Sequence, residues 1–192
     1  MKDNLLEWLS PEAIQTIDRE SGEILDLIVD SGAGKPKRKG LVVGYVQSGK
    51  TTNYSAVIAK AIDRGYRFII VLAGMHNILR EQTQKRLEDY IGTAYREMNQ
   101  HIQLLTHRGA DIEDEVSWYP ETTSLAVVKK QSERLQALLD LIEKAKSEGE
   151  LDDVKVLMID DESDQATPNT AEQREEYSKV NKLIRQIIHV AL

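Results

Sequence analysis

The chain has 192 residues, of which 41% are hydrophobic and 30% charged, with a formal net charge of −7. This length suits one sizeable α/β domain, and the acidic balance argues against a wholly basic nucleic-acid binder while leaving room for a local basic groove. The absence of cysteine excludes disulfides and cysteine-ligated metal sites, and no apolar run approaches the ~20 residues that span a membrane. Since the N-terminus also lacks the apolar core of a secretion signal, we expect a cytoplasmic protein without membrane contact.

Residues 1–39 form the first predicted unit, a helical segment that ends in a basic linker. Ser10 is a suitable N-cap, with Pro11 at the first helical position. Apolar residues at helical spacing follow: Ala13, Ile14, Ile17, Ile24, Leu25, Leu27 and Ile28. The stretch 31–40 is rich in glycine and basic residues, and we interpret it as a solvated linker, with contact to phosphate as the alternative.

From residue 40 onward, apolar runs of strand length alternate with amphipathic stretches of helix length. Strands are predicted at 41–43, 67–73, 102–106, 124–128 and 154–159. Helices are predicted at 52–62, 77–90 and 131–146, followed by a last helix up to residue 191. This alternation predicts a mainly parallel sheet of about five strands with helices on both faces, a three-layer α/β fold.

The last predicted helix carries a strong apolar stripe formed by Tyr177, Val180, Ile184, Ile187, Ile188 and Ala191. No glycine or proline ends it, and so apolar a stripe needs a partner surface. We therefore interpret residues 40–192 as one lobe near the N-terminus of a longer protein. A short protein that ends on a packed helix is the alternative.

The segment Gly44 to Thr51, GYVQSGKT, matches the phosphate-loop pattern G-x-x-x-x-G-K-[ST] between a predicted strand and a predicted helix. In such a loop, backbone N–H groups and the positive end of the helix dipole converge on an anion. The predicted contacts to a nucleoside triphosphate are Gly44, Gln47, Ser48, Gly49, Lys50, Thr51 and Thr52. Lys50 would bridge the β- and γ-phosphates, and the Thr51 hydroxyl would ligate Mg²⁺. An ordinary glycine turn is the alternative.

A cluster of carboxylates, DDESD at residues 160–164, follows the last predicted strand, where α/β folds hold their ligands. Asp161 is the preferred Mg²⁺ ligand, although strand register alone leaves Asp160 open for this role. Glu162 would orient or deprotonate the attacking water. Taken alone, such a cluster is typical of a solvated acidic turn. The phosphate loop upstream favours the functional interpretation.

Together these motifs resemble the first RecA-like lobe of superfamily two helicases. Gly44–Thr51 looks like motif I, 161–164 looks like motif II, and Val71–Thr83 looks like motif Ia, which touches the nucleic-acid backbone. A closer resemblance is to the Z-one domain, a bacterial family described as endonuclease or helicase-like and found near restriction and phage-defence genes. The segments that carry this resemblance are GYVQSGKTTNY, LREQTQKRL, IDDESDQATPNT and VNKLIRQI, so that it covers about residues 40–192.

The resemblance implies a P-loop ATPase motor lobe that uses ATP and Mg²⁺ and acts on DNA. It implies nucleic-acid contacts from His76, Arg80 and Lys129, each with a solvated surface position as the alternative. The family continues into a T-A-T-P-like motif III and a second RecA-like lobe, and this sequence stops before both. We therefore expect weak nucleotide binding and slow hydrolysis from this chain alone. No P-D-(D/E)-x-K or histidine–metal signature supports a nuclease.

Two other functions fit the same motifs. One is a nucleotide-dependent switch or scaffold, which regulates a partner without moving along nucleic acid. The other is a P-loop kinase, which is disfavoured because Glu162 beside Asp161 suits activation of water and because no arginine-rich lid stands out. Since no guanine-reading N-K-x-D occurs, adenine is favoured by the resemblance alone.

Overall fold

The computed structural model describes residues 9–28, 39–43, 49–92, 101–106, 112, 116, 118–119, 121–164 and 178–192. The helices are α1 (Pro11–Ile28), α2 (Lys50–Asp63), α3 (Asn77–Leu87), the short π-helix η2 (Glu88–Gly92), α5 (Ser132–Ser147) and α6 (Lys179–Ala191). The strands are β1 (Tyr66–Ala73), β2 (Ile102–Leu104), β3 (Thr123–Lys129) and β4 (Lys155–Asp160). Each lies within a few residues of a predicted element, except that the sequence predicted one strand more.

The described strands form one sheet in the order β2-β3-β1-β4, and every pair is parallel. The central strand β1 pairs through Phe68 with Ser124 of β3 and with Val156 of β4. The prediction of an α/β fold with a parallel sheet is therefore confirmed. Because parallel strands run in the same direction, the carboxyl ends of β1, β3 and β4 meet at one edge of the sheet.

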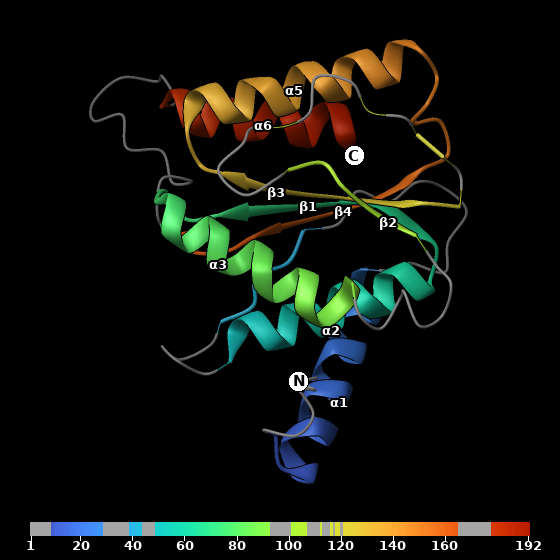
Figure 1. The fold of residues 1–192 in the computed structure, drawn as a ribbon, viewed down its shortest axis with the longest axis vertical. Helices are drawn as coiled ribbons and strands as arrows, with labels where there is room; N and C mark the ends of the chain where they lie inside the picture. Colours follow the sequence, from blue (N-terminus) through green and yellow to red (C-terminus); the bar gives the residue numbers. More distant parts are fainter. Residues whose placement is uncertain are drawn as a thin grey trace.

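The sheet lies between two helical layers, with α5 and α6 on one face and α2 and α3 on the other (Figure 1). Alternate side chains of β1 enter the two cores. Phe68, Ile70 and Leu72 pack with the apolar residues of α5 and α6. Ile69, Val71 and Ala73 pack with those of α2. Burial on both faces explains why β1 is almost continuously apolar instead of alternating between apolar and polar residues.

The apolar stripe of α6, from Val180 onward, packs against α5 and the sheet. Leu183, Ile184 and Ile187 are buried in the same core as Leu138 and Ile142 of α5. Ser178 caps the helix by accepting a hydrogen bond from the backbone N–H of Asn181 at 3.3 Å. The partner surface that the stripe requires therefore lies within the described chain.

Helix α1 packs on the outer side of α2 and completes the lower layer (Figure 1). Its predicted cap is present, since Ser10 Oγ accepts from the N–H of Ala13 at 3.2 Å. Leu25 is buried in the core beneath β1, and Lys60 of α2 forms an ion pair with Asp18 at 2.8 Å. Of the predicted N-terminal unit, the helix is therefore packed onto the α/β domain.

The predicted strand at 41–43 is wrong. Leu41, Val42 and Val43 adopt no strand structure and are 77%, 60% and 85% exposed. A strand needs a neighbour that accepts its backbone hydrogen bonds, and these three residues pair with none of the four described strands, including β4 at the edge of the sheet. The described sheet accordingly has four strands and not about five. Among the described residues, no helix has the length and apolar character needed to cross a membrane.

The packing of α5 makes a stability prediction. Replacement of the fully buried Leu138 by alanine should lower the free energy of unfolding by about 2–5 kcal/mol, because it leaves a cavity between α5 and the sheet. The exposed Gln136 lies on the same helix, and Gln136→Ala should change this free energy by about 0.5 kcal/mol or less. Urea denaturation of both variants measures the difference. Equal losses would contradict the packing of α5 described above.

Candidate functional site

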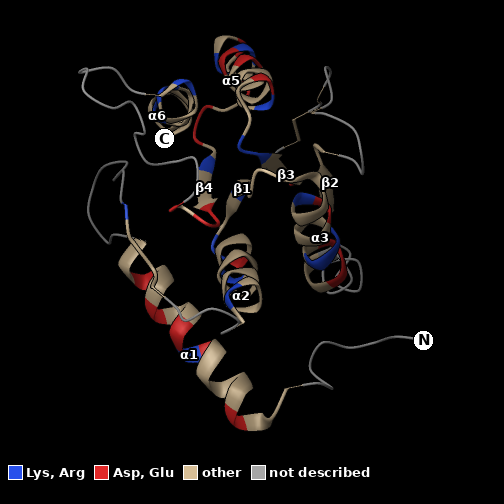
Figure 2. Cartoon of the chain, turned by 90° about the vertical axis from the view of Figure 1, so that its left-hand side faces the viewer, with Lys and Arg blue, Asp and Glu red and all other residues tan. Residues whose placement is uncertain are grey.

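The candidate site lies at the carboxyl edge of the sheet. Here Ala73 pairs with Lys129, and Leu72 pairs with Asp160. The backbone N–H of Asp161 donates to the carbonyl of Leu72 at 2.9 Å, so β4 stays aligned with β1 up to its last residue. The residues that follow the three strands therefore lie close together. Figure 2 looks onto this edge and shows the acidic segment after β4 pointing toward α2.

A side-chain contact joins Asp161 to the helix that the phosphate-loop motif opens. The Tyr54 hydroxyl donates to Asp161 Oδ2 at 3.2 Å. Tyr54 lies one turn after Lys50 on α2, so the first turns of this helix and the acidic end of β4 occupy the same end of the fold. Lys50 therefore lies one helical turn from the residue that contacts Asp161, and its own place in a nucleotide site stays a prediction.

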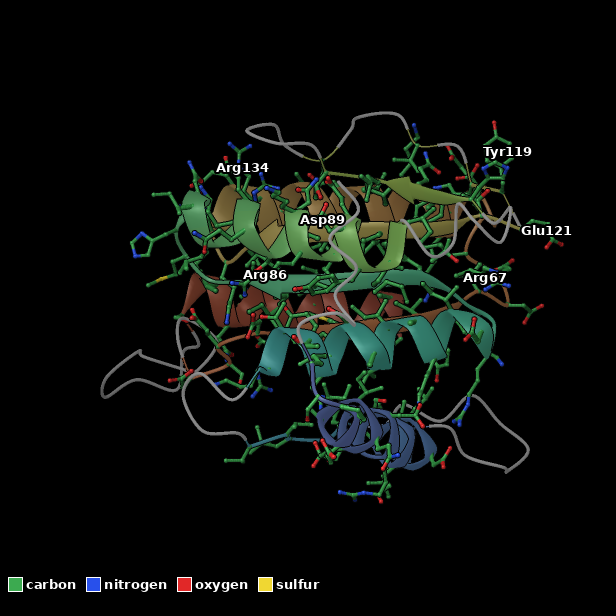
Figure 3. The ribbon with its side chains drawn as sticks, turned by 60° about the horizontal axis from the view of Figure 1, so that its bottom comes forward. Arg67, Arg86, Asp89, Tyr119, Glu121 and Arg134 are labelled. Carbon is green, nitrogen blue, oxygen red and sulfur yellow. The ribbon has the colours of Figure 1, made fainter. Side chains whose placement is uncertain are left out.

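The N-terminal end of α2 begins at Gly49, which has φ 73° and ψ 26°. This left-handed conformation favours glycine because it carries no Cβ. Lys50 is exposed, and Thr51 Oγ1 lies 3.4 Å from Arg86 Nη1 of α3. Arg86 projects from α3 toward α2 (Figure 3), so it places a cation beside Thr51.

Of the remaining predicted phosphate contacts, the structure describes only Thr52. Thr52 lies in the first turn of α2 and is partly buried. Gly44, Gln47 and Ser48 lie outside the described residues. The predicted phosphate contacts of these three residues therefore stay predictions.

The two adjacent aspartates have different partners. Asp160 Oδ1 forms an ion pair with Lys130 Nζ at 2.7 Å, and the lysine side chain is fully buried. Asp161 instead faces α2 through Tyr54. The sequence left open whether Asp160 or Asp161 would bind a metal. The geometry favours Asp161, because Asp160 already forms an ion pair with a buried lysine.

Glu162 lies in the turn after β4, with a left-handed backbone at φ 55°. Its carboxylate rests against Gly74, the residue that follows β1. An ideal Cβ on Gly74 would lie 2.7 Å from Glu162 Oε2, so a glycine makes room for this carboxylate. Oε2 is buried and accepts no hydrogen bond from the residues that the structure describes. A buried carboxylate oxygen of this kind is suited to accept a hydrogen bond from a donor such as water.

The three predicted nucleic-acid contacts have different surroundings. His76 is exposed and precedes α3 at the carboxyl edge. Lys129 Nζ donates to Asn77 Oδ1 at 2.6 Å beside it. Arg80, however, is buried and donates to Gln84, which in turn donates to the carbonyl of Thr106 at 2.5 Å. The guanidinium of Arg80 therefore helps to fix α3 against the segment after β2.

Two aromatic residues with stacking potential lie away from this edge. Trp118 packs edge-on against Phe68, with ring centroids 5.0 Å apart and planes at 75°. Tyr119 is exposed at the end of the molecule opposite to Arg86 (Figure 3). Trp118 is thus a packing residue.

The sequence did not assign four residues the places that they take beside these motifs: Tyr54, Gly74, Arg86 and Lys130. For Tyr54 a signal existed, since a position three residues after Thr51 lies on the same helix face. The other three depend on contacts between distant segments. A buried lysine in particular has no local sequence signature, because lysine is ordinarily solvated.

The donor set would fit a magnesium ion that is held mainly by a nucleotide. The described residues contain no cluster of three or more histidine, aspartate or glutamate side chains that could bind a metal by themselves. Mg²⁺ commonly takes one or two carboxylates, several waters and the oxygens of substrate phosphates. Thr51 and Asp161 supply the hydroxyl and the carboxylate that such a site needs.

Comparisons with known proteins add no relative. No model of a protein family matches the chain, and neither a curated protein nor a solved structure does. A function for this chain is therefore inferred from its residues and their geometry.

The contact between Tyr54 and Asp161 predicts a pH dependence. Burial raises the pKa of Tyr54, and the negative charge of Asp161 raises it further above its usual value of 10.0. The folded state keeps this proton where the unfolded chain loses it, so the contribution of Tyr54 to stability is complete below pH 10.0 and declines as pH rises further. The free energy of unfolding should fall more steeply above that pH in the wild type than in Tyr54→Phe. Denaturant titrations on both sides of that pH measure the two slopes, and equal slopes would contradict the contact.

Proposed function

We propose that the chain binds ATP and Mg²⁺ at the carboxyl edge of its sheet and hydrolyses ATP, as the motor lobe of a helicase-like protein that acts on DNA. The observation that carries this proposal is the hydrogen bond from Tyr54 to Asp161. It joins the helix opened by a phosphate-loop motif to the acidic end of a neighbouring strand. In the proposed complex the start of α2 supplies cations and the end of β4 supplies carboxylates to a magnesium triphosphate.

In the binding step, the N-terminal end of α2 receives the phosphates. The free N–H groups of its first turn and the helix dipole attract the anion. Lys50 contacts the β- and γ-phosphates, and Arg86 adds positive charge from α3. Thr51 and Asp161 would hold the magnesium ion, which would supply positive charge to the phosphates.

In the hydrolytic step, Glu162 orients a water molecule in line with the γ-phosphate. The water oxygen bonds to the γ-phosphorus, and the bond from that phosphorus to the β–γ bridging oxygen breaks. The water proton passes to the Glu162 carboxylate, and the products are ADP and phosphate. Lys50 stabilises the charge that gathers on the phosphate oxygens, and a bound magnesium ion would add to this effect.

The wider role rests on the motifs that resemble the Z-one family and the first RecA-like lobe of helicases. In that role a second RecA-like lobe closes on the nucleotide, and DNA contacts the carboxyl edge near His76 and Lys129. Both residues lie on the same edge as the proposed nucleotide site. A role in restriction or phage defence follows from the same resemblance.

One observation favours a regulatory switch as the second candidate. Met75, Ile78 and Leu79 are exposed beside His76 at the start of α3. An apolar surface at this place suits a protein partner better than a phosphate backbone. In that case the nucleotide state would control the binding of a partner, without movement along DNA.

Lys50 tests nucleotide binding. Loss of one charge-assisted contact to phosphate costs about 1.5–3 kcal/mol, so Lys50→Ala should weaken ATP binding by roughly 10- to 10²-fold. The matched control is Lys144→Ala, which removes the same charge from an exposed position on α5, across the sheet. Isothermal titration calorimetry with Mg·ATP measures both. An affinity of Lys50→Ala equal to that of the control would overturn the proposed site.

Glu162 and DNA together separate the motor from the switch. Glu162→Gln should leave ATP binding unchanged and slow hydrolysis by about 10²-fold or more, because it removes the proton acceptor. A motor should hydrolyse ATP faster when single- or double-stranded DNA is added to the intact protein. Phosphate release with and without DNA is the measurement. Hydrolysis that depends on Glu162 but ignores nucleic acid would favour the switch.

A further inference from the structure

A fully buried lysine lies at the carboxyl edge of the sheet, beside the proposed catalytic residues. Lys130 follows β3, and its side chain is 0% exposed. Lysine is almost never fully buried unless it is paired, since an isolated ammonium group loses its hydration. The partners of this ammonium group therefore indicate what it does.

Two of these partners flank the proposed metal ligand. Lys130 Nζ lies 2.7 Å from Asp160 Oδ1 and donates to the backbone carbonyl of Glu162 at 2.6 Å. Asp160 and Glu162 are the residues immediately before and after Asp161. A single ammonium group therefore holds the side chain before this carboxylate and the backbone carbonyl after it.

The lysine reaches its partners across the central strand. Because β1 lies between β3 and β4, the side chain of Lys130 crosses the carboxyl end of β1 to reach the turn after β4. Gly74 occupies that end of β1, and the carboxylate of Glu162 rests against it. Lys130 and Gly74 therefore confine Glu162 from two directions, one at its backbone and the other at its side chain.

The conformation of Glu162 requires such a restraint. Its φ of 55° lies in the left-handed region, which is unfavourable for a residue with a Cβ and persists where surrounding contacts impose it. The bond from Lys130 to the Glu162 carbonyl is a contact of this kind. Without it, the turn can relax toward ordinary backbone angles and carry the carboxylate away from Gly74.

We propose that Lys130 is a positioning residue, which holds Asp161 and Glu162 in the arrangement needed for magnesium binding and water activation. This inference rests on the proposed ATP hydrolysis. Lys130 contacts neither substrate nor metal and acts through the turn that it fixes. By pairing with Asp160, it also leaves Asp161 as the carboxylate that faces α2.

The test must separate positioning from folding, because loss of Lys130 alone leaves the charge of Asp160 without its partner. The double variant Lys130→Met/Asp160→Asn removes both charges and keeps the volume of the lysine stem. A merely structural ion pair predicts that the double variant regains both stability and activity relative to Lys130→Met. A positioning role predicts that it regains stability and not activity.

The measurements on the intact protein are the free energy of unfolding, the affinity for Mg·ATP and kcat. For the double variant we expect wild-type folding, ATP affinity within about threefold and a kcat lower by about 10²-fold, since small displacements of a catalytic group cost this much. Lys144→Met on α5 is the control for loss of one lysine charge and should keep the wild-type kcat. A wild-type kcat in the double variant would overturn the inference while leaving ATP hydrolysis in place.

A second readout needs no nucleotide. An amine-reactive acylating reagent, followed by peptide mass spectrometry, should label Lys144 rapidly and Lys130 only after unfolding. Labelling of Lys130 as fast as Lys144 would overturn the inference whatever the kcat values are. A protected Lys130 in a wild-type protein that neither binds nor hydrolyses ATP would show instead that the proposed function has failed, and with it the role of Lys130 in that reaction.

Discussion

The pairing of β1 with β3 on one edge and β4 on the other is the constraint on which the site depends. These strands are far apart in the sequence, yet their parallel register brings Ala73, Lys129 and Asp160 to one edge. Each strand then contributes a residue that the others need: Gly74 provides space, Lys130 provides a cation and Asp161 provides a carboxylate. The helices add to this edge, since α2 carries Lys50 and Tyr54 to it. No local segment could assemble such a set alone.

The charges at this edge are arranged in pairs with different purposes. The ion pair of Lys130 with Asp160 is buried, and such a pair offers little net stability because desolvation offsets the attraction. Its value lies in fixing one conformation of the turn after β4. Asp161, by contrast, receives only the neutral hydroxyl of Tyr54 among the side-chain hydrogen bonds described above, so its charge remains available to a metal. Lys50 of α2 and Arg86 of α3 supply the cations of the proposed site.

The sequence predicted most of the fold because β1 and β3 are apolar on both faces and amphipathic helices separate the strands. It failed at residues 41–43, since an apolar run shows that a strand could be buried but not whether it pairs with a strand of the sheet. It preferred Asp161 as the metal ligand but left Asp160 open. The ion pair of Lys130 with Asp160 favours Asp161, and Lys130 follows β3 and carries no local signal of its burial. The likeness to helicase lobes stays a prediction, as do the contacts of Gly44, Gln47 and Ser48.

The separation of the central strand from its neighbours also has a consequence during synthesis. Phe68 pairs with Ser124 and Val156, so the most apolar strand leaves the ribosome long before either neighbour has been translated. At roughly 5–20 residues per second, this nascent segment waits a few seconds without a native edge. In that interval the backbone of residues 68–73 lacks its hydrogen-bond partners, and the apolar side chains FIIVLA are exposed. Chaperones bind segments of this kind. The nascent chain is therefore most prone to aggregation at β1, the strand that later pairs with both β3 and β4.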